Sequence, residues 1–274
     1  MDFHISQFLS PGRKEFVKGT LLLTGAGLFC RVLGFFYRIY MSRTIGAEGL
    51  GLYNMIHPLF SIAFAVCAGS IQTALSQYIA ASQEKVPAVF KCGLFLSLSL
   101  SVIPLLLLWK GKMFLAGNIL SEPQAARYLP VLAVSVPFAC LHACINGYFY
   151  GKKKASVPAL TQLLEQLARV GCVFLVTGAD LSEGRTPSIN AAVLGLTVGE
   201  LLSMLIALIC LYIHLYPDAS VLSLQNICPS SAVYRDLLGM ALPLTANRIV
   251  LNILQSIEAV SIPQKLLLYG YDTT

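Results

Sequence analysis

The fold of this chain is decided by a long apolar stretch near its start, Thr20–Met41, which has the sequence TLLLTGAGLFCRVLGFFYRIYM. Its polar and small residues recur at intervals of three or four, so they form one stripe along one side of a helix. The other positions are almost all leucine, phenylalanine or other apolar residues, as in a helix that crosses a membrane. The members of the stripe are Thr20, Thr24, Gly27, Arg31, Gly34 and Arg38.

The two arginines of this stripe are costly in a membrane. Placing an arginine at the centre of a bilayer costs about 3 kcal/mol on insertion scales, so such residues normally face a bundle interior or a wet cavity. We therefore expect Arg31 and Arg38 to line a cavity that accepts an anion, with Thr24, Gly27 and Gly34 around it. Alternatively, both arginines reach the membrane surface or pair with acids of neighbouring helices. The cavity is the favoured interpretation, because their own helix carries no acid to pair with.

Composition marks the whole chain as an integral membrane protein. Of its 274 residues, 56% are hydrophobic and 12% are charged, whereas a soluble domain carries about 25% charged residues. The apolar runs have helical periodicity and far exceed the roughly 9–11 residues of a barrel strand. The predicted fold class is therefore all-α, a polytopic transmembrane bundle of about seven helices. The predicted spans are 16–41, 52–80, 90–110, 127–150, 157–178, 189–216 and 233–262.

Basic residues predict the orientation of the chain in the membrane. The segment 1–15 and the loop Lys152–Lys154 carry clusters of lysine and arginine, which favour the cytosolic side. We therefore expect residues 1–15 to be a cytosolic amino-terminal tail. Met1–Ser10 has no lysine or arginine, so the first helix is interpreted as a retained span and not as a cleaved signal peptide. The net charge of +6 is scattered over short loops, which gives no support for nucleic-acid binding.

The sequence predicts no metal site, no cofactor and no enzyme active site. The eight cysteines lie mostly inside the predicted spans and form no CxxC motif, so they are interpreted as small, reduced core residues. Cys140 and Cys144 share a helix face, but His142 between them points to another side. The GxSxG, HExxH and P-loop motifs of common enzymes do not occur in the sequence.

Short loops predict antiparallel neighbours in an up-and-down bundle. Residues 16–216 then form a six-helix amino-terminal lobe. Residues 217–232, which include Pro217 and Pro229, are the predicted linker between lobes. Residues 233–274 are expected to be the first helix of an incomplete second lobe. A single helix beyond the linker indicates a partial chain.

The last predicted helix repeats the pattern of the first, with a polar stripe built around an arginine. We expect Arg248 to face a phosphate, with Asn252 and Gln255 lining the same cavity. The stripe is expected to face a second lobe, or a second copy of the chain, and not the preceding helices. Glu258 lies on the stripe and is alternatively a group that binds a proton or a sodium ion, because carboxylates in membranes often relay protons.

Further charges at membrane depth predict ion pairs. Glu165 precedes Arg169 by four residues, the favourable order for a pair on one helix. This pair is either a neutral packing element or a pair that differs between transport states. Glu200 has no partner on its own helix, so Arg31 or Arg38 could be its counter-ion. The planar guanidinium suits the oxygens of a phosphate, so a lipid-linked diphosphate fits the predicted cavity better than a cation does.

Three segments resemble one family of transporters. They are RVLGFFYRIYMSRTIGAEGLGLYNM (Arg31–Met55), TQLLEQLARV (Thr161–Val170) and ANRIVLNILQSIEAVSIPQKL (Ala246–Leu266). They resemble the polysaccharide-transport family that includes stage V sporulation protein B, within the multidrug/oligosaccharidyl-lipid/polysaccharide flippase superfamily. The resemblance implies two six-helix lobes around a central cavity that moves lipid-linked glycans by alternating access. It also implies a bacterial plasma membrane, or the forespore membrane during assembly of cortex peptidoglycan, as the location.

The resemblance also bears on the substrate. In the lipid II flippase branch of the superfamily, arginines of the first helix are implicated in substrate binding, and Arg31 and Arg38 match them. Residues 59–79 carry no charge, which departs from that branch and argues against lipid II itself. The predicted function is therefore flipping of lipid-linked polysaccharide or peptidoglycan precursors, with the anionic substrate and membrane lipid as partners. Two alternatives are a cation-coupled drug antiporter of the same fold, which needs an acidic cavity, and a truncated lobe that does not transport.

Overall fold

The computed structural model describes residues 11–81, 86–215 and 231–268, with side chains over 17–81, 86–215 and 233–255 and at 257. Every regular element in these ranges is a helix, which confirms the all-α class. Six elements of the described chain are long and apolar enough to cross a membrane. The first of them is 65 residues long and crosses twice, so these helices make the seven crossings that the sequence predicts.

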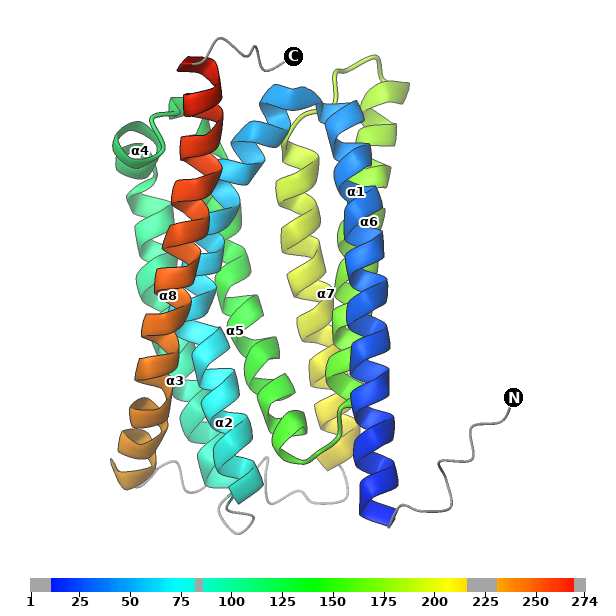
Figure 1. Cartoon of the computed structure of the whole chain (residues 1–274), viewed down its shortest axis with the longest axis vertical. Coiled ribbons are helices and arrows are strands. Elements are labelled where there is room, and N and C mark those ends of the chain that lie inside the picture. Colours follow the sequence, from blue (N-terminus) through cyan, green and yellow to red (C-terminus); the bar gives the residue numbers. More distant parts are fainter. Residues whose placement is uncertain (1–10, 82–85, 216–230, 269–274) are drawn as a thin grey trace, which may run out of the picture.

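The first helix, α1 (Pro11–Phe64), bends back on itself at Gly46. The φ angle of Gly46 is 83°, in a region that glycine adopts without steric penalty and other residues rarely adopt. Two arms result, and they run in opposite directions across the bundle (Figure 1). A π-helical turn, η2 (Ala65–Gly69), and α2 (Ser70–Ala81) continue the second arm. The first two predicted spans are thus the two arms of one continuous element.

The remaining spans agree with the predicted ranges to within a few residues at most of their ends. Short helical turns fill the connection between the third and fourth predicted spans. The elements are α3 (Val86–Lys110), α4 (Lys112–Phe114), η4 (Leu115–Ile119), η5 (Pro123–Arg127), α5 (Leu129–Gly151), α6 (Ser156–Ser182), α7 (Asn190–Leu215) and α8 (Ser231–Leu268).

α5 lies at the centre of the bundle, because it packs against α2, α3 and α7. Small buried residues such as Ala139 and Ala143 let the neighbouring helices approach closely. A Cβ atom at Gly147 would lie 2.7 Å from the backbone oxygen of Gln72 in α2, so the close approach requires glycine there. The first arm of α1 packs on α6, which in turn packs on α7, and these helices form the other side of the bundle (Figure 1).

The last helix, α8, packs on α1, α2 and α3. Leu237 and Ala241 are buried in an apolar cluster shared with α2, α3 and α5. Further along, Arg248 donates a hydrogen bond to Thr73 of α2 over 3.3 Å. The prediction that the polar stripe of this helix faces away from the preceding helices is therefore wrong at Arg248. The physical reason is Gly69, where a Cβ atom would lie 2.7 Å from Nη1 of Arg248, so the missing side chain makes room for the guanidinium.

Part of the predicted domain organisation falls outside the described residues. Residues 1–10 of the predicted tail and residues 217–230 of the predicted linker belong to this part. The division into a lobe of residues 16–216 and a further segment of residues 233–274 stays a prediction.

Candidate functional site

A cavity of about 710 Å³ lies between the two arms of α1 and the neighbouring face of α6. The first arm supplies two predicted phosphate-facing residues, Arg31 and Arg38, and α6 adds a third arginine, Arg169. None of the described residues that line this cavity is acidic. The lining residues are Arg31, Gly34, Phe35, Tyr37, Arg38, Met41, Leu50, Tyr53, Asn54, His57, Pro58, Gln166 and Arg169.

The bend of α1 and the spacing of its polar stripe bring these residues together. Arg31, Gly34 and Arg38 lie on one face of the first arm, and the bend at Gly46 folds the second arm across from them. A Cβ atom at Gly34 would lie 3.6 Å from Nε2 of Gln166, which is ordinary van der Waals contact. The two arginines of the arm are exposed, so they can meet a ligand without first breaking up a packed core.

Two of the predicted cavity residues do not border this cavity. Thr24 is exposed and Gly27 is half-buried, and both precede the lining residues by one or two helical turns. Only the second half of the polar stripe therefore contributes to the cavity wall.

A second pocket, of about 350 Å³, adjoins the first, and His57 lines both. α8 contributes the predicted residues Arg248, Asn252 and Gln255 to it. The structure thus brings these three together, but in a different pocket from the arginines of α1. The other walls are Phe60, Ser61, Phe64, Ala65 and Leu251. The side chain of Glu258 lies outside the described residues.

The predicted ion pair on α6 is present. Nη2 of Arg169 lies 2.5 Å from Oε1 of Glu165, and the two side chains are 18% and 19% exposed. Gly199 of α7 packs against this pair, since a Cβ atom there would lie 3.1 Å from the backbone oxygen of Glu165. Arg169 therefore has two neighbours at once: the carboxylate of Glu165 on one side and the cavity on the other.

The predicted partner of Glu200 is wrong. Oε2 of Glu200 lies 3.1 Å from Nδ1 of His142 on α5, so a histidine takes the place of the predicted Arg31 or Arg38. The reason is that α7 packs mainly on α5 and α6, and Glu200 points into that interface. Glu165 joins the pair: ligand atoms of the three residues all lie within 4.8 Å of one another, close enough to hold an ion. The pattern of the sequence does not predict this group.

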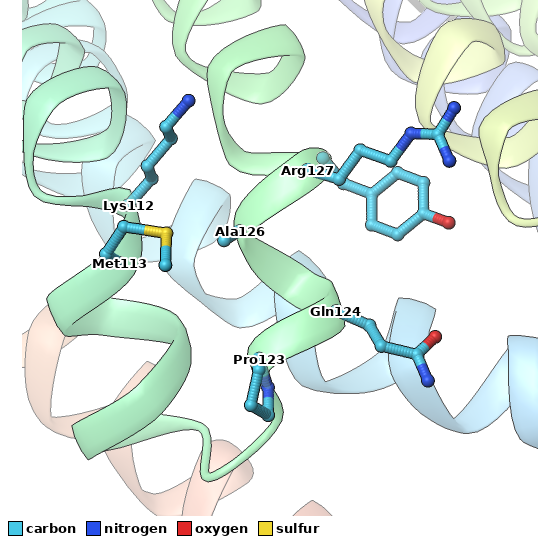
Figure 2. A pocket seen from close by; sticks show the side chains of 7 residues that line it. Lys112, Met113, Pro123, Gln124, Ala126 and Arg127 are labelled. Atoms are coloured by element: carbon cyan, nitrogen blue, oxygen red, sulfur yellow. The ribbon is translucent and has the colours of Figure 1, made fainter.

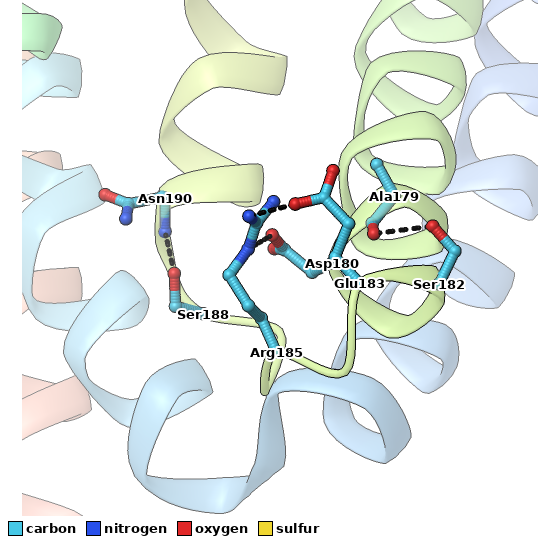
Figure 3. A network of polar contacts seen from close by, with 7 residues as sticks. All are labelled: Ala179, Asp180, Ser182, Glu183, Arg185, Ser188 and Asn190. Atoms are coloured by element: carbon cyan, nitrogen blue, oxygen red, sulfur yellow. Dashed lines mark hydrogen bonds and ion pairs between the residues drawn. The ribbon is translucent and has the colours of Figure 1, made fainter.

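Two further polar clusters lie away from the cavity, at the end of the bundle that holds the bend of α1 (Figure 1). One borders a pocket of about 400 Å³ beside the short helices α4 and η5, where Lys112 and Arg127 are among the lining residues (Figure 2). In the other, Arg185 pairs with Asp180 and Glu183 at the connection between α6 and α7 (Figure 3). Neither cluster contains a residue that the sequence predicts as functional.

Comparison with known proteins places this arrangement of helices and arginines in a family. The family described as polysaccharide biosynthesis protein matches residues 16–267, which is most of the chain. The chain belongs to this family. It is 30% identical over 268 residues to stage V sporulation protein B of Bacillus subtilis, covering 95% of the chain and 51% of that relative. It is 21% identical over 180 residues to the lipid II flippase MurJ of the same organism, covering 61% of the chain and 33% of that relative.

Solved structures show the same fold. A MOP superfamily transporter from Pyrococcus furiosus matches this chain with a TM-score of 0.63 at 19% identity, covering 88% of this chain and 53% of the transporter. An outward-facing multidrug resistance transporter of the MATE family matches with the same TM-score, identity and coverage. The chain spans about half the length of the curated relatives and of the solved structures that it matches.

Proposed function

We propose that this chain is the anion-binding part of a membrane transporter for lipid-linked glycans, and that its cavity holds their diphosphate. The observation that carries the proposal is the meeting of Arg31, Arg38 and Arg169 in one cavity whose described lining has no acid. The names of two relatives support it, since one is called a lipid II flippase and the other a stage V sporulation protein.

The chemistry of the lining fits a diphosphate. A guanidinium stays charged at any physiological pH and donates two parallel hydrogen bonds to the oxygens of a phosphate. Uncompensated guanidiniums are costly at membrane depth, and a bound anion reduces that cost. The amides of Asn54 and Gln166, which also line the cavity, offer donors and acceptors for sugar hydroxyls.

The second pocket supplies a second station for the same anion. It adjoins the first at His57 and carries Arg248, whose guanidinium already donates to Thr73. We infer that the diphosphate passes between the two pockets as the transporter alternates between its states. A second lobe, or a second copy of the chain, completes the passage. We propose that the substrate moves outward across a bacterial plasma membrane, for cell-wall or spore-cortex assembly, with the amino terminus of the chain in the cytosol.

A cation-coupled drug antiporter is the second candidate, since a multidrug resistance transporter of the MATE family shares the fold. The cavity disfavours it. A cationic drug bound there would face three guanidiniums and no carboxylate among the described lining residues, so the Coulomb energy opposes its binding.

Binding of a short prenyl diphosphate tests the proposal. The chain is placed in lipid nanodiscs and titrated with farnesyl diphosphate, with farnesol as the uncharged analogue. We expect the diphosphate to bind and farnesol not to saturate the chain. The double variant Arg31→Ala, Arg38→Ala should weaken diphosphate binding by about a hundredfold, because each charge-assisted contact is worth roughly 1.5 kcal/mol or more.

A matched control separates the cavity from general charge. Arg43 lies on the same arm of α1, is exposed and does not line the cavity, so Arg43→Ala should leave the affinity within about twofold. Equal saturable binding of farnesol and farnesyl diphosphate, or an unchanged affinity in the double variant, would contradict the proposal.

A further inference from the structure

Three ionisable side chains meet behind the wall of the cavity. His142 comes from α5, Glu165 from α6 and Glu200 from α7, and all three helices cross the membrane. Their ligand atoms lie within 4.8 Å of one another, and Nδ1 of His142 is 3.1 Å from Oε2 of Glu200. The three residues are named the His142 cluster below. None of them lines either of the two pockets.

The atoms at the centre of the His142 cluster have few polar neighbours. Nδ1 of His142 and Oε2 of Glu200 lie at ion-pair distance, both are sealed from solvent, and neither has a further hydrogen-bond partner among the described residues. His142 is 8% exposed and Glu200 is 4% exposed. Buried polar atoms are nearly always hydrogen-bonded, because an unsatisfied one carries the full penalty of desolvation. The cluster can therefore bind one more partner through these atoms.

The charge of the cluster identifies that partner. Two carboxylates face one guanidinium, that of Arg169, so with a neutral imidazole the group carries one uncompensated negative charge. An uncompensated charge at this depth is expensive, and one added proton removes it. Histidine takes up a proton near physiological pH, whereas hard metal cations prefer oxygen ligands. The mixed set of one imidazole and two carboxylates thus favours a proton over a sodium ion.

Arg169 connects this charge to the cavity. Its guanidinium bonds Glu165 of the cluster and also lines the cavity. An anion in the cavity draws Arg169 away from Glu165, which leaves the carboxylates less compensated and raises their attraction for a proton. Conversely, a proton on the cluster removes one negative charge, so the electrostatic attraction between the cluster and Arg169 weakens. The guanidinium of Arg169 is then available to bind the anion. The two binding events must then favour each other by the same factor.

Other titratable groups around Arg169 and the cluster come from every element packed there. Histidine is the side chain whose unperturbed pKa lies between about pH 5 and 8. His57 therefore competes with the His142 cluster as a site for the proton, and it needs its own control. The surrounding groups are Tyr37, Arg38, Tyr53 and His57 of α1, Cys140 of α5, and the cluster residues themselves.

We propose that His142, Glu165 and Glu200 form a proton-binding site, and that Arg169 couples its occupancy to anion binding in the cavity. The inference rests on the proposed function, because the coupled ligand is the anion of that cavity. Its chemical consequence is that each bound anion brings a proton with it.

Calorimetry with farnesyl diphosphate tests the coupling. Chain in nanodiscs is titrated at pH 6 and pH 8 in buffers that differ in ionisation enthalpy, which reports the protons taken up per bound ligand. The variant Glu200→Gln removes the uncompensated charge and so imitates the protonated cluster. We expect it to bind the diphosphate about tenfold more tightly than the wild type at pH 8, to match the wild type at pH 6, and to take up about one proton fewer. A gain in affinity cannot come from misfolding.

Two controls isolate the cluster. Asp180→Asn removes a carboxylate near the end of α6, away from the His142 cluster, where Asp180 pairs with Arg185 (Figure 3). Asp180→Asn should bind the diphosphate with the affinity and pH dependence of the wild type. His57→Gln should keep the pH dependence of binding and the proton uptake of the wild type. Protonation of the ligand itself is the same in all variants and cancels in the comparison.

The outcomes are distinguishable. Diphosphate binding with the same pH dependence in the wild type and in Glu200→Gln overturns the coupling and leaves the proposed function standing. Tighter binding on addition of sodium chloride rather than potassium chloride at fixed pH, without a pH effect, also overturns it, in favour of a sodium site. Absence of any diphosphate binding in the wild type overturns the proposed function and this inference together.

Discussion

Among single residues, Arg169 has the most constrained surroundings, since it serves the ion pair and the cavity with one guanidinium. Its Nε atom is buried and has no hydrogen-bond partner among the described residues, so the pair with Glu165 is its main compensation. Loss of Glu165 therefore removes the bonded carboxylate of Arg169, and loss of Arg169 leaves Glu165 and Glu200 without a cationic partner.

A double-variant comparison tests this pair. Glu165→Gln should destabilise the folded chain by about 2 kcal/mol, because Arg169 loses its bonded carboxylate at low dielectric and keeps only Glu200, which makes no direct bond to it. The loss is below the roughly 3–5 kcal/mol of a fully buried pair, since each side chain keeps nearly a fifth of its exposure. The double variant Glu165→Gln, Arg169→Gln should lose less than the single one. Thermal unfolding in detergent measures both, and equal losses in the two variants would show that the residues do not interact.

The sequence predicts some of these contacts and misses others for a physical reason. Spacing along one helix predicts the pair of Glu165 and Arg169, because four residues bring side chains onto one face. Glu200 and His142 lie on different helices, which spacing alone does not relate. Distance from the turn between α5 and α6 could have related His142 to Glu165. His142 lies nine residues before the end of α5 at Gly151, and Glu165 lies nine residues after the start of α6 at Ser156. In antiparallel neighbours joined by a short turn, that places the two side chains level.

At the scale of elements, close contact between helix backbones holds the centre of the bundle together. Gly147 of α5 faces the backbone of Gln72 in α2, and Gly195 of α7 similarly faces the backbone of Arg169, where an added Cβ atom would lie 2.9 Å from the backbone oxygen. Backbone atoms cannot rotate out of the way as a side chain can. These glycines thus fix the distances between the helices, and those distances set the size of the pockets.

Two alanine substitutions test this packing. Gly147→Ala should destabilise the chain by about 2 kcal/mol, since α2 and α5 must separate to admit the methyl group. Gly171→Ala on α6 is the matched control, because a Cβ atom added there would meet nothing within 4 Å. That control should stabilise the helix by up to about 1 kcal/mol. Chemical or thermal unfolding of the two variants measures the difference, and the idea fails if both behave alike.

The helices themselves are predictable from the sequence, but their connections are less so. Apolar runs of membrane length predict all seven crossings. In the hydrocarbon of a membrane, a single segment of this length satisfies its backbone polar groups by forming a helix. The bend at Gly46 joins two predicted spans into one element, and a short polar segment there looks the same in sequence whether it is a loop or a bent helix. The docking of Arg248 on Thr73 depends on a missing side chain at Gly69, which hydrophobic periodicity does not register.

For the whole molecule, the placement of basic residues predicts the orientation of the bundle in the membrane. The loop between α5 and α6 carries Lys152–Lys154, whereas the connection between α6 and α7 carries the cluster of Arg185 and its acids. Figure 1 places these two connections at opposite ends of the bundle. From the positive-inside rule we predict that the first end faces the cytosol.

Cysteine labelling in intact bacterial cells tests the orientation. Gln124→Cys, on η5 at the outer end, should react with a membrane-impermeant maleimide, whereas Lys152→Cys should react only after the cells are permeabilised. The unsubstituted chain reports the background, since its described cysteines are buried or half-buried. Labelling of Lys152→Cys in intact cells would contradict the predicted orientation.

The π-helical turn η2 (Ala65–Gly69) has a consequence for how this chain tolerates insertions and deletions. A π-turn holds one residue more than an α-helical turn, and each residue of an α-helix advances its side chains by about 100°. Deleting one residue from this turn would restore regular α-helical winding and leave the phase of α2 nearly unchanged, because the extra residue is already absorbed in the wider turn. Deleting one residue from the regular helix beside the turn would instead rotate all of α2 by about 100° relative to the second arm of α1. Thr73 would then leave Arg248, and the buried face of α2 would turn toward lipid. A change of one residue in length is therefore better tolerated at this turn than in the helix on either side of it.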